Sequence, residues 1–339
     1  MKERSYSLDV IRVLACLMVI VMHSPIPGSS GSGTILAAVS YFTAPCIGLF
    51  FMVSGALLLP IKTDTWTFVK KRLFKVLCPT LFWTAFYLFL NIISGEADFH
   101  DILLALVALP FAPQGHGVLW FMYVMTGLYL LTPILSAWVE KSDSKTIKIY
   151  LLLWAVTLCL PFLKLFVKIP SGETFILYYF SGYAGYFLLG YYINGRKQCR
   201  QTGWGRKSVL WLAGIAITII PPVVFRMINI EFDFYSLFWY LSIGVATMCL
   251  GWFKLIQKTD FFRRQNRFTI AMSDVSKMSF GIYLIHIFVM RGILWKWDFL
   301  QTLPYTLQIP LCTVLTFVIS YAIIKCISKL SFSKYIIGC

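Results

Sequence analysis

The stretch Leu8-Asp-Val-Ile-Arg12-Val-Leu-Ala-Cys-Leu-Met-Val-Ile-Val-Met-His23 begins the chain with an apolar run that is typical of a membrane-crossing helix. Asp9, Arg12 and His23 interrupt this run, and ionisable groups are costly enough in hydrocarbon to be candidate functional residues. The eleven residues from Arg12 to His23 correspond to three helical turns plus about 20°, with a rise of about 16 Å. The spacing therefore predicts that Arg12 and His23 share one stripe of one helix, with Arg12 nearer the cytoplasmic end.

The rest of the chain continues this apolar character. Of its 339 residues, 59% are hydrophobic and 13% are charged, and the mean hydropathy is +0.77. Soluble domains are about 45–50% apolar and about 25% charged, so too little polar surface remains here for a soluble globule. The composition excludes a soluble enzyme, a disordered protein and a free nucleic-acid-binding protein, and it predicts a polytopic membrane protein.

Ten mostly apolar windows predict an all-α membrane bundle of about ten transmembrane helices, since about 20 residues cross the hydrocarbon. The windows cover residues 8–25, 40–60, 76–94, 118–138, 147–167, 175–195, 208–226, 235–256, 278–295 and 306–328. The shorter apolar segment from Ile102 to Phe111 is expected to be interfacial or re-entrant. Because no connection is long enough for an appended soluble domain, we expect a single integral-membrane domain over residues 1–339.

The Lys and Arg residues orient these helices. With a cytoplasmic N-terminus, 25 of the 30 basic residues lie in inner segments and 5 lie in outer segments. Basic residues are retained on the cytoplasmic side during insertion, so we expect both termini to be cytoplasmic. The same rule accounts for the net charge of +16 without a nucleic-acid partner.

Each candidate residue also has a structural interpretation. Arg12 can act as a snorkelling anchor paired with Asp9, and His23 can lie at the outer headgroups. His286, in the middle of window 278–295, fits a hydrogen bond within the bundle as well as it fits a site. The basic cluster before the third window can set topology, or it can bind phosphate. It consists of Lys71, Arg72 and Lys75.

The cysteines point to packing rather than to chemistry. The nine cysteines form no C-x-x-C pair, and most of them lie in apolar stretches. We therefore expect neither a disulfide framework nor a metal site.

Five stretches, in chain order, resemble the acyltransferase-3 family, the bacterial integral-membrane O-acyltransferases of surface polysaccharides. They are Leu8-Asp-Val-Ile-Arg12 with His23; Phe50-Phe-Met-Val-Ser54-Gly; Lys71-Arg-Leu-Phe-Lys75 through Pro79; Leu119-Trp120-Phe with Tyr129 and Pro133; and Ser279-Phe-Gly-Ile-Tyr283-Leu-Ile-His286. The similarity is spread over most of the chain, and the family also has ten helices.

Two departures from the family pattern are visible. The family often has a second arginine where this chain has Lys75, which keeps the charge but loses the planar fork. Many members place a histidine where this chain has Val118, two residues before the Trp-Phe pair. His116 is near that position but out of register, so we transfer no role to it.

The resemblance implies a membrane O-acyltransferase of the bacterial cytoplasmic (inner) membrane that moves an acetyl group from acetyl-CoA to a sugar hydroxyl of a cell-surface or lipid-linked polysaccharide. It implies His23 as the base, with Arg12 and Asp9 in the catalytic site. It implies that the donor phosphates are bound by Arg72, Lys75 and Lys71. It also implies a pocket that is lined by Ser54, Trp120, Tyr283 and His286. Whether His23 is itself acylated or only removes a proton stays open.

The expected ligands and partners follow from the same resemblance. Acyl-CoA would be a donor substrate rather than a permanently bound cofactor. Membrane lipids and the glycan acceptor are expected partners, and other glycan-assembly proteins can join them. The alternative function is a transporter or flippase of a lipid-linked sugar, because charged groups in a bundle also mark substrate paths. Such proteins often have inverted repeats and paired broken helices, and the sequence shows neither.

Overall fold

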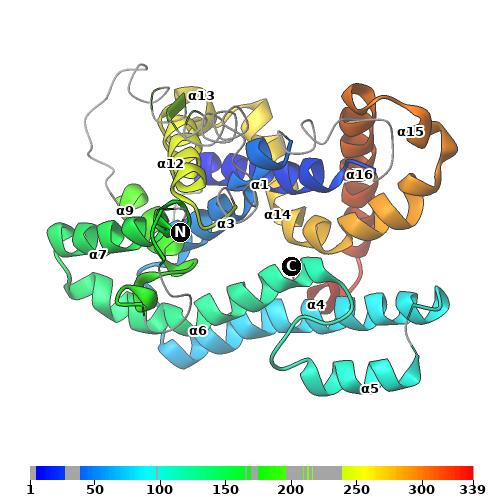
Figure 1. Ribbon diagram of the computed structural model, residues 1–339, viewed down its shortest axis with the longest axis horizontal. Helices are drawn as coiled ribbons and strands as arrows, with labels where there is room; N and C mark the ends of the chain where they lie inside the picture. The colour runs from blue at the N-terminus through cyan, green and yellow to red at the C-terminus, as the bar shows by residue number, and fades with distance from the viewer. Residues whose placement is uncertain are drawn as a thin grey trace.

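The computed structural model describes residues 5–26, 39–96, 98–164, 166–168, 175–195 and 239–338, together with residues 209, 212, 213 and 216. Every regular element in these ranges is a helix, which confirms the predicted all-α class (Figure 1). The longer elements are α1 (Tyr6–His23), α3 (Pro45–Leu58), α4 (Thr65–Ile93), α5 (Phe99–Ala108), α6 (Trp120–Lys141), α7 (Ser144–Thr157), α9 (Ala184–Gly195), α12 (Ile243–Lys258), α14 (Arg267–Ile287) and α16 (Tyr305–Ile327). The shorter ones are η1 (Gly117–Leu119), α8 (Leu160–Leu163), η2 (Tyr178–Phe180), α13 (Asp260–Arg263), η3 (Phe288–Ile293), η4 (Leu294–Lys296), α15 (Asp298–Thr302) and α17 (Ser333–Ile336).

Within the described residues, seven helical stretches are long and apolar enough to cross a membrane. They are Tyr6–His23, Val39–Leu58, Thr65–Ile93, Gly117–Lys141, Ser144–Leu163, Arg267–Lys296 and Tyr305–Ile327. Seven of the ten predicted windows therefore coincide with such a stretch. The chain is a multi-pass helical membrane protein.

The other three windows differ from their predictions or fall outside the described residues. In window 175–195, the turn at Gly182, where φ is 92°, delays the start of α9 to Ala184. In window 235–256, α12 starts only at Ile243, after Ser242 caps it by accepting a hydrogen bond from the Val245 N–H. Window 208–226 lies outside the described residues except for residues 209, 212, 213 and 216. The ten-helix count and the cytoplasmic location of both termini therefore stay predictions.

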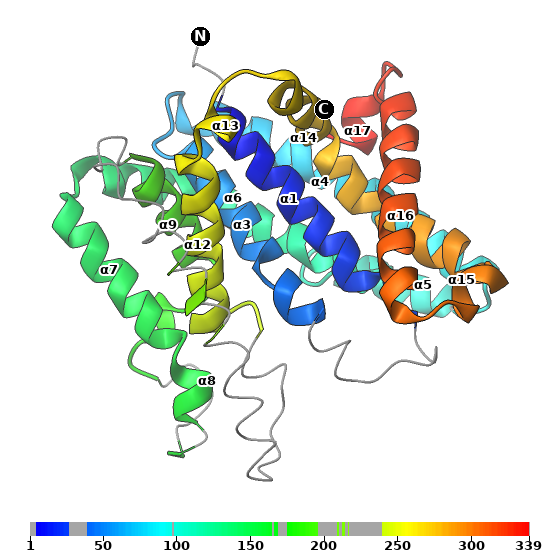
Figure 2. The same ribbon diagram turned by 90° about the horizontal axis from the view of Figure 1, so that it is seen from above.

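Helix α1 runs through the middle of the bundle. It packs against α3, α12, α14 and α16, as the view of Figure 2 shows. The α3 window is 83% buried, whereas the α7 window is 28% buried. Helices that are apolar all round belong in the interior, and α7 has a large surface left for lipid.

Two glycines bring α3 and α9 into backbone contact. A Cβ at Gly55 would collide with the carbonyl oxygen of Phe187, and a Cβ at Gly190 would collide with the backbone of Met52. Small residues allow such close approach between membrane helices, where dispersion contacts replace the hydrophobic effect as the source of stability. Among the described helices, this pair makes the closest backbone contact.

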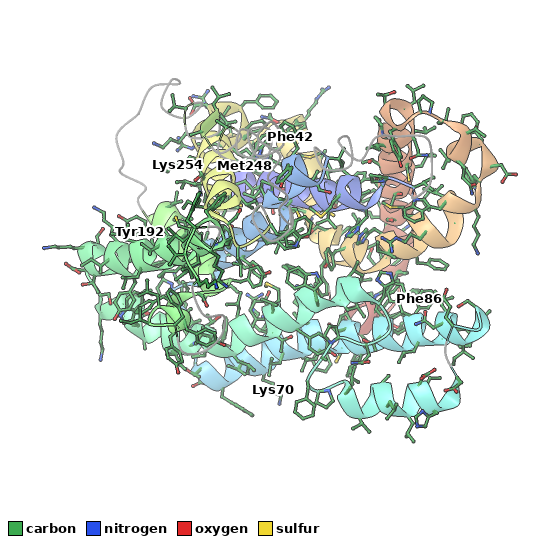
Figure 3. All side chains as sticks on the ribbon, viewed as in Figure 1. Phe42, Lys70, Phe86, Tyr192, Met248 and Lys254 are labelled. Carbon is green, nitrogen blue, oxygen red and sulfur yellow. The ribbon has the colours of Figure 1, made fainter. Side chains whose placement is uncertain are left out.

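Helices α4 and α6 form a second layer beside the layer of α1, α3 and α14 (Figure 1). Phe86 of α4 fills the space between the layers (Figure 3), with its ring 5.1 Å from that of Phe288. Two tyrosine hydroxyls also join the layers, because Tyr87 donates to the Leu284 carbonyl at 2.8 Å and Tyr283 donates to the Val118 carbonyl at 2.6 Å. These contacts fix the position of α14 relative to η1.

The segment expected to be interfacial or re-entrant forms α5, a helix of ten residues. Asp98 and Asp101 cap it reciprocally, each side chain accepting from the other residue's backbone N–H. Its Leu103, Leu106 and Val107 side chains are exposed. Ten residues rise only about 15 Å, so α5 cannot cross the hydrocarbon by itself.

Candidate active site

His23, the last residue of α1, lines a cavity of about 560 Å³. Its wall is formed by residues from α1, α3, η1, α6, α14 and η3 and from the segments just before α3, η1, α9 and α12. Concave pockets of this size, mostly apolar with a few polar groups, are typical of binding sites for small molecules. The cavity therefore brings together parts of the chain that lie up to 272 positions apart, from Val19 to Arg291.

His286 of α14 lies directly behind His23. Their ring centroids are 5.6 Å apart, with 39° between the ring planes. The side chain of His286 is fully buried, and its Nδ1 bonds to the Tyr283 carbonyl oxygen. A carbonyl can only accept, so Nδ1 carries the proton and Nε2 of the neutral ring is an acceptor. Within the described part of the chain, Nε2 of His286 has no hydrogen-bond partner.

Two predicted pocket residues, Trp120 and Tyr283, do line this cavity. Trp120 stacks on Tyr240 with ring centroids 5.6 Å apart and an interplanar angle of 27°. The ring centroid of Tyr183 also lies 5.6 Å from that of Trp120, with 41° between the ring planes. The aromatic wall thus gives the cavity flat apolar faces next to the imidazole of His23.

Ser54, the remaining predicted pocket residue, is not part of the cavity. It lies half-buried on α3 and is absent from the cavity wall. Ser54 lies on the same side of α3 as Ile47, which lines the cavity, but seven residues further along the helix, about two turns or about 10 Å beyond it. The Phe-Phe-x-x-Ser-Gly segment instead places Gly55 at the contact with α9.

His116, to which no role was assigned, lines the same cavity. It is the N-cap of η1, and its Nδ1 accepts a hydrogen bond from the Val118 N–H at 3.2 Å. Nδ1 is therefore unprotonated, and the neutral ring carries its proton on Nε2. Burial lowers the pKa of His116, and the positive charge of Arg291 lowers it further. The family pattern has a histidine two residues later in the chain, where this protein has Val118, so the pattern pointed near His116 but not at it.

Arg291 was not predicted as a site residue, because in the sequence it is only one of the five basic residues expected on the outer side. It lies in η3, a π-turn that continues α14, and it lines the cavity. Its guanidinium carbon lies 5.0 Å from the ring centroid of Trp295. Tyr183, Trp239 and Tyr240 were missed for another reason, since nothing in a single sequence brings these segments beside α1.

Asp9 and Arg12 lie at the other end of α1, away from the cavity. Asp9 accepts hydrogen bonds from Ser273 at 2.7 Å and from Ser276 at 2.8 Å. Arg12 donates to the Ser276 hydroxyl at 3.2 Å and lies 4.0 Å from the Asp9 carboxylate. This network ties α1 to α14, so α1 turns both Arg12 and His23 toward the same neighbouring helix.

The structure brings part of the basic cluster toward Arg12. Arg72 is half-buried, with its guanidinium carbon 5.7 Å from the ring centroid of Phe68. Arg12 and Arg72 both lie close enough to the half-buried Tyr129 for their charges to act on its hydroxyl. Lys71 and Lys75 are exposed on α4. The site residues therefore form two groups, one around His23 and one around Arg12 and Arg72.

One group of potential metal ligands lies in the described residues, at the exposed start of α5. It consists of Asp98, His100 and Asp101, whose ligand atoms lie within 4.8 Å of one another. Asp98 and Asp101 already use their carboxylates to cap this helix. Exposed acidic residues with that structural role give no reason to assign a metal site.

Comparison with curated proteins gives no match, and comparison with solved structures gives none either. A family model described as an acyltransferase domain matches residues 5–325, which is nearly the whole chain. The match includes α1 with Arg12 and His23, the basic cluster of α4, and α14 with His286. The chain therefore belongs to the acyltransferase-3 family of membrane acyltransferases.

Proposed function

We propose that the protein is an O-acyltransferase of the bacterial inner membrane that transfers an acetyl group from acetyl-CoA to a sugar hydroxyl of a surface or lipid-linked polysaccharide. The observation that carries the proposal is the position of His23. It lies on the wall of a cavity of about 560 Å³, at the end of the helix that also carries Arg12. Family membership supports acyl transfer, and the aromatic wall of Trp120 and Tyr240 supports a sugar-sized ligand.

His23 is proposed as the general base. Its neutral imidazole takes the proton of the acceptor hydroxyl while that oxygen attacks the thioester carbonyl carbon. The C–S bond then breaks, and the CoA sulfur leaves with the proton that His23 had taken. The products are the sugar ester and free CoA, and His23 is neutral again. A two-step route, in which His23 carries the acyl group between donor and acceptor, uses the same residues.

The donor is proposed to bind by its phosphates near Arg12 and Arg72, with Lys75 and Lys71 at the rim. The charges of both arginines reach Tyr129, which supports one shared anion site. Arginine and lysine bind phosphate oxygens through charge-assisted hydrogen bonds. The rise of about 16 Å from Arg12 to His23 is a distance that the pantetheine arm of CoA can span.

The test is acetyl transfer to surface glycan in cells that produce the wild-type protein, the His23→Ala variant or the Arg12→Ala variant. We expect both variants to lose acetylation at equal protein levels. His100→Ala is the matched control, because His100 is exposed on α5 and should leave acetylation unchanged. Normal acetylation in both test variants would reject the proposed site. Movement of a lipid-linked sugar across proteoliposomes without acyl-CoA would instead indicate the transporter.

A further inference from the structure

Arg291 occupies an unusual place in the backbone. A regular α-helix would put Arg291 about 140° around the axis from His286, five residues earlier. The chain instead forms the π-turn η3 from Phe288 to Ile293, and i→i+5 hydrogen bonding brings side chains five apart back toward one face. π-turns inside helices are frequent at functional sites. The charge of Arg291 accordingly reaches His23, His116 and His286 together.

Among the described residues, no carboxylate balances this charge. The described residues that line the cavity include no Asp or Glu, and no described acid forms an ion pair with Arg291. Trp295 covers the guanidinium by a cation–π contact at 5.0 Å. A cation–π contact does not use the N–H donors of a guanidinium, and these donors can form a two-pronged bond to a carboxylate or a phosphate.

His116 adds a second, uncharged donor to the same cavity. Its Nδ1 is occupied by the Val118 N–H, so its Nε2–H is the donor that remains. Arg291, His116 and the base His23 all line one cavity, whereas Asp9 and the basic cluster of α4 do not. The anion-binding groups at this end are thus separate from those assigned to the donor.

We propose that Arg291, assisted by His116, binds an anionic group of the acceptor, so that the acceptor carries a carboxylate or a phosphate ester near the hydroxyl that is acylated. The identification of the ligand as the acceptor rests on the proposed function. The anion site itself does not, because it can be tested by binding alone. Two sources fit the chemistry: an acidic sugar, or the phosphate that joins a sugar to its lipid carrier.

The experiment measures quenching of tryptophan fluorescence in the full-length protein in phosphatidylcholine nanodiscs. The probes are octyl glucoside, octyl glucuronide and octyl phosphate, which share an alkyl chain, each below its micelle concentration. We expect the wild-type protein to bind at least one anionic probe about tenfold or more tightly than octyl glucoside, as charge-assisted bonds do. A preference for octyl glucuronide identifies an acidic sugar, and a preference for octyl phosphate identifies the carrier phosphate.

The variants separate this inference from its alternatives. Arg291→Gln should abolish the preference, while Arg291→Lys should keep part of it and so report on the charge if the glutamine variant fails to fold. Lys296→Gln is the matched control, because this exposed lysine follows η3 closely but does not line the cavity. His23→Ala should keep the preference even though it abolishes acyl transfer, so the failure of one proposal is distinct from the failure of the other.

Three results would overturn the inference. The first is equal affinity of the wild-type protein for all three probes, and the second is an anionic preference that survives Arg291→Gln. The third comes from nanodiscs that contain phosphatidylglycerol: if that lipid abolishes the preference by occupying Arg291, the residue is a lipid-headgroup anchor and not part of the acceptor site.

Discussion

The imidazole rings of His23 and His286 lie 5.6 Å apart where the end of α1 meets α14. Only His23 lines the cavity, whereas His286 is completely buried behind it. The Nδ1 of His286 is committed to the Tyr283 carbonyl, which directs the acceptor nitrogen Nε2 away from its own backbone. His286 is thus suited to position His23 or to polarise it, without touching the substrate.

His286→Asn and His286→Gln distinguish its two nitrogens. The asparagine amide can still donate to the Tyr283 carbonyl, as Nδ1 does, but it has nothing at the place of Nε2. The longer glutamine amide reaches the place of Nε2. If Nε2 positions His23, we expect His286→Asn to lower kcat about tenfold or more with little change in KM, and His286→Gln to restore part of the rate. Equal rates in the two variants and the wild type would show that His286 only packs.

Arg72→Gln should weaken donor binding. The side chain lies with Arg12 near Tyr129, so its loss removes contacts that we expect in both the ground state and the transition state. The expected result is a KM for acetyl-CoA raised about tenfold, with kcat nearly unchanged. Lys70→Gln is the control, because Lys70 is exposed on the same helix and points away from the bundle (Figure 3). A similar change in both variants would assign the effect to general surface charge.

Asp9→Ala tests whether the network at the start of α1 is structural. The substitution removes the acceptor of the Ser273 and Ser276 hydroxyls and a charge beside Arg12. We expect a loss of stability of about 1–3 kcal/mol, measured as a lower midpoint of thermal unfolding in detergent. Asp9→Asn keeps one acceptor oxygen and should lose less. An Asp9→Ala protein with unchanged stability and no activity would instead support the catalytic role that the family resemblance assigns to Asp9.

Gly190→Ala should destabilise the wall formed by α3 and α9. The added methyl group meets the backbone of Met52, which cannot rotate away as a side chain would. Overpacking of this kind costs about 1–3 kcal/mol, and more where backbone must move. Gly127→Ala is the matched control, since a Cβ at this position in α6 meets nothing within 4 Å. Thermal unfolding should separate the two variants, and equal midpoints would contradict the close approach of α3 and α9.

The pKa of His116 makes stability depend on pH. Burial lowers this pKa in the folded protein below its ordinary value of 6.5, so the unfolded chain takes up the proton first as the pH falls. Stability should therefore decrease as the pH falls below about 6.5, until the lower folded pKa is passed. His116→Asn keeps a side-chain acceptor at the N-cap of η1 but does not titrate. Its unfolding midpoint should fall less between pH 7 and pH 5 than that of the wild type, and parallel curves would rule out the lowered pKa.

The sequence was sufficient where a local pattern sets the structure. The apolar run from Leu8 to His23 forms α1, and the helical period predicts the shared direction of Arg12 and His23, both of which contact α14. The segment from Ile102 to Phe111 was predicted to be too short to cross, and it overlaps α5, whose start at Phe99 is set by the caps of Asp98 and Asp101. The predicted start of a helix was too early where a turn or a cap interrupts the apolar window, as at Gly182 before α9 and at Ser242 before α12.

The site could be predicted only in part, because most of it depends on long-range packing. His23, Trp120 and Tyr283 stand in recognisable motifs, and they line the cavity. Arg291 enters it through a change of helical register at η3, which the apolar pattern of α14 does not reveal. Ser54 also stands in a motif but lies outside the cavity wall, next to Gly55, which packs against the backbone of α9.

The contact of α3 with α9 has a mechanical consequence. Backbones that touch through Gly55 and Gly190 can neither slide nor tilt without a collision, so this side of the molecule behaves as a stiff support. For the proposed glycan acceptor, entry would then depend on movement elsewhere in the cavity wall, such as η3, which continues α14 in a different helical register and packs Phe288 on Phe86 of α4. Rings in an edge-to-face contact can move by side-chain rotation, whereas interlocked peptide groups cannot, so we expect any opening of the cavity on the η3 side.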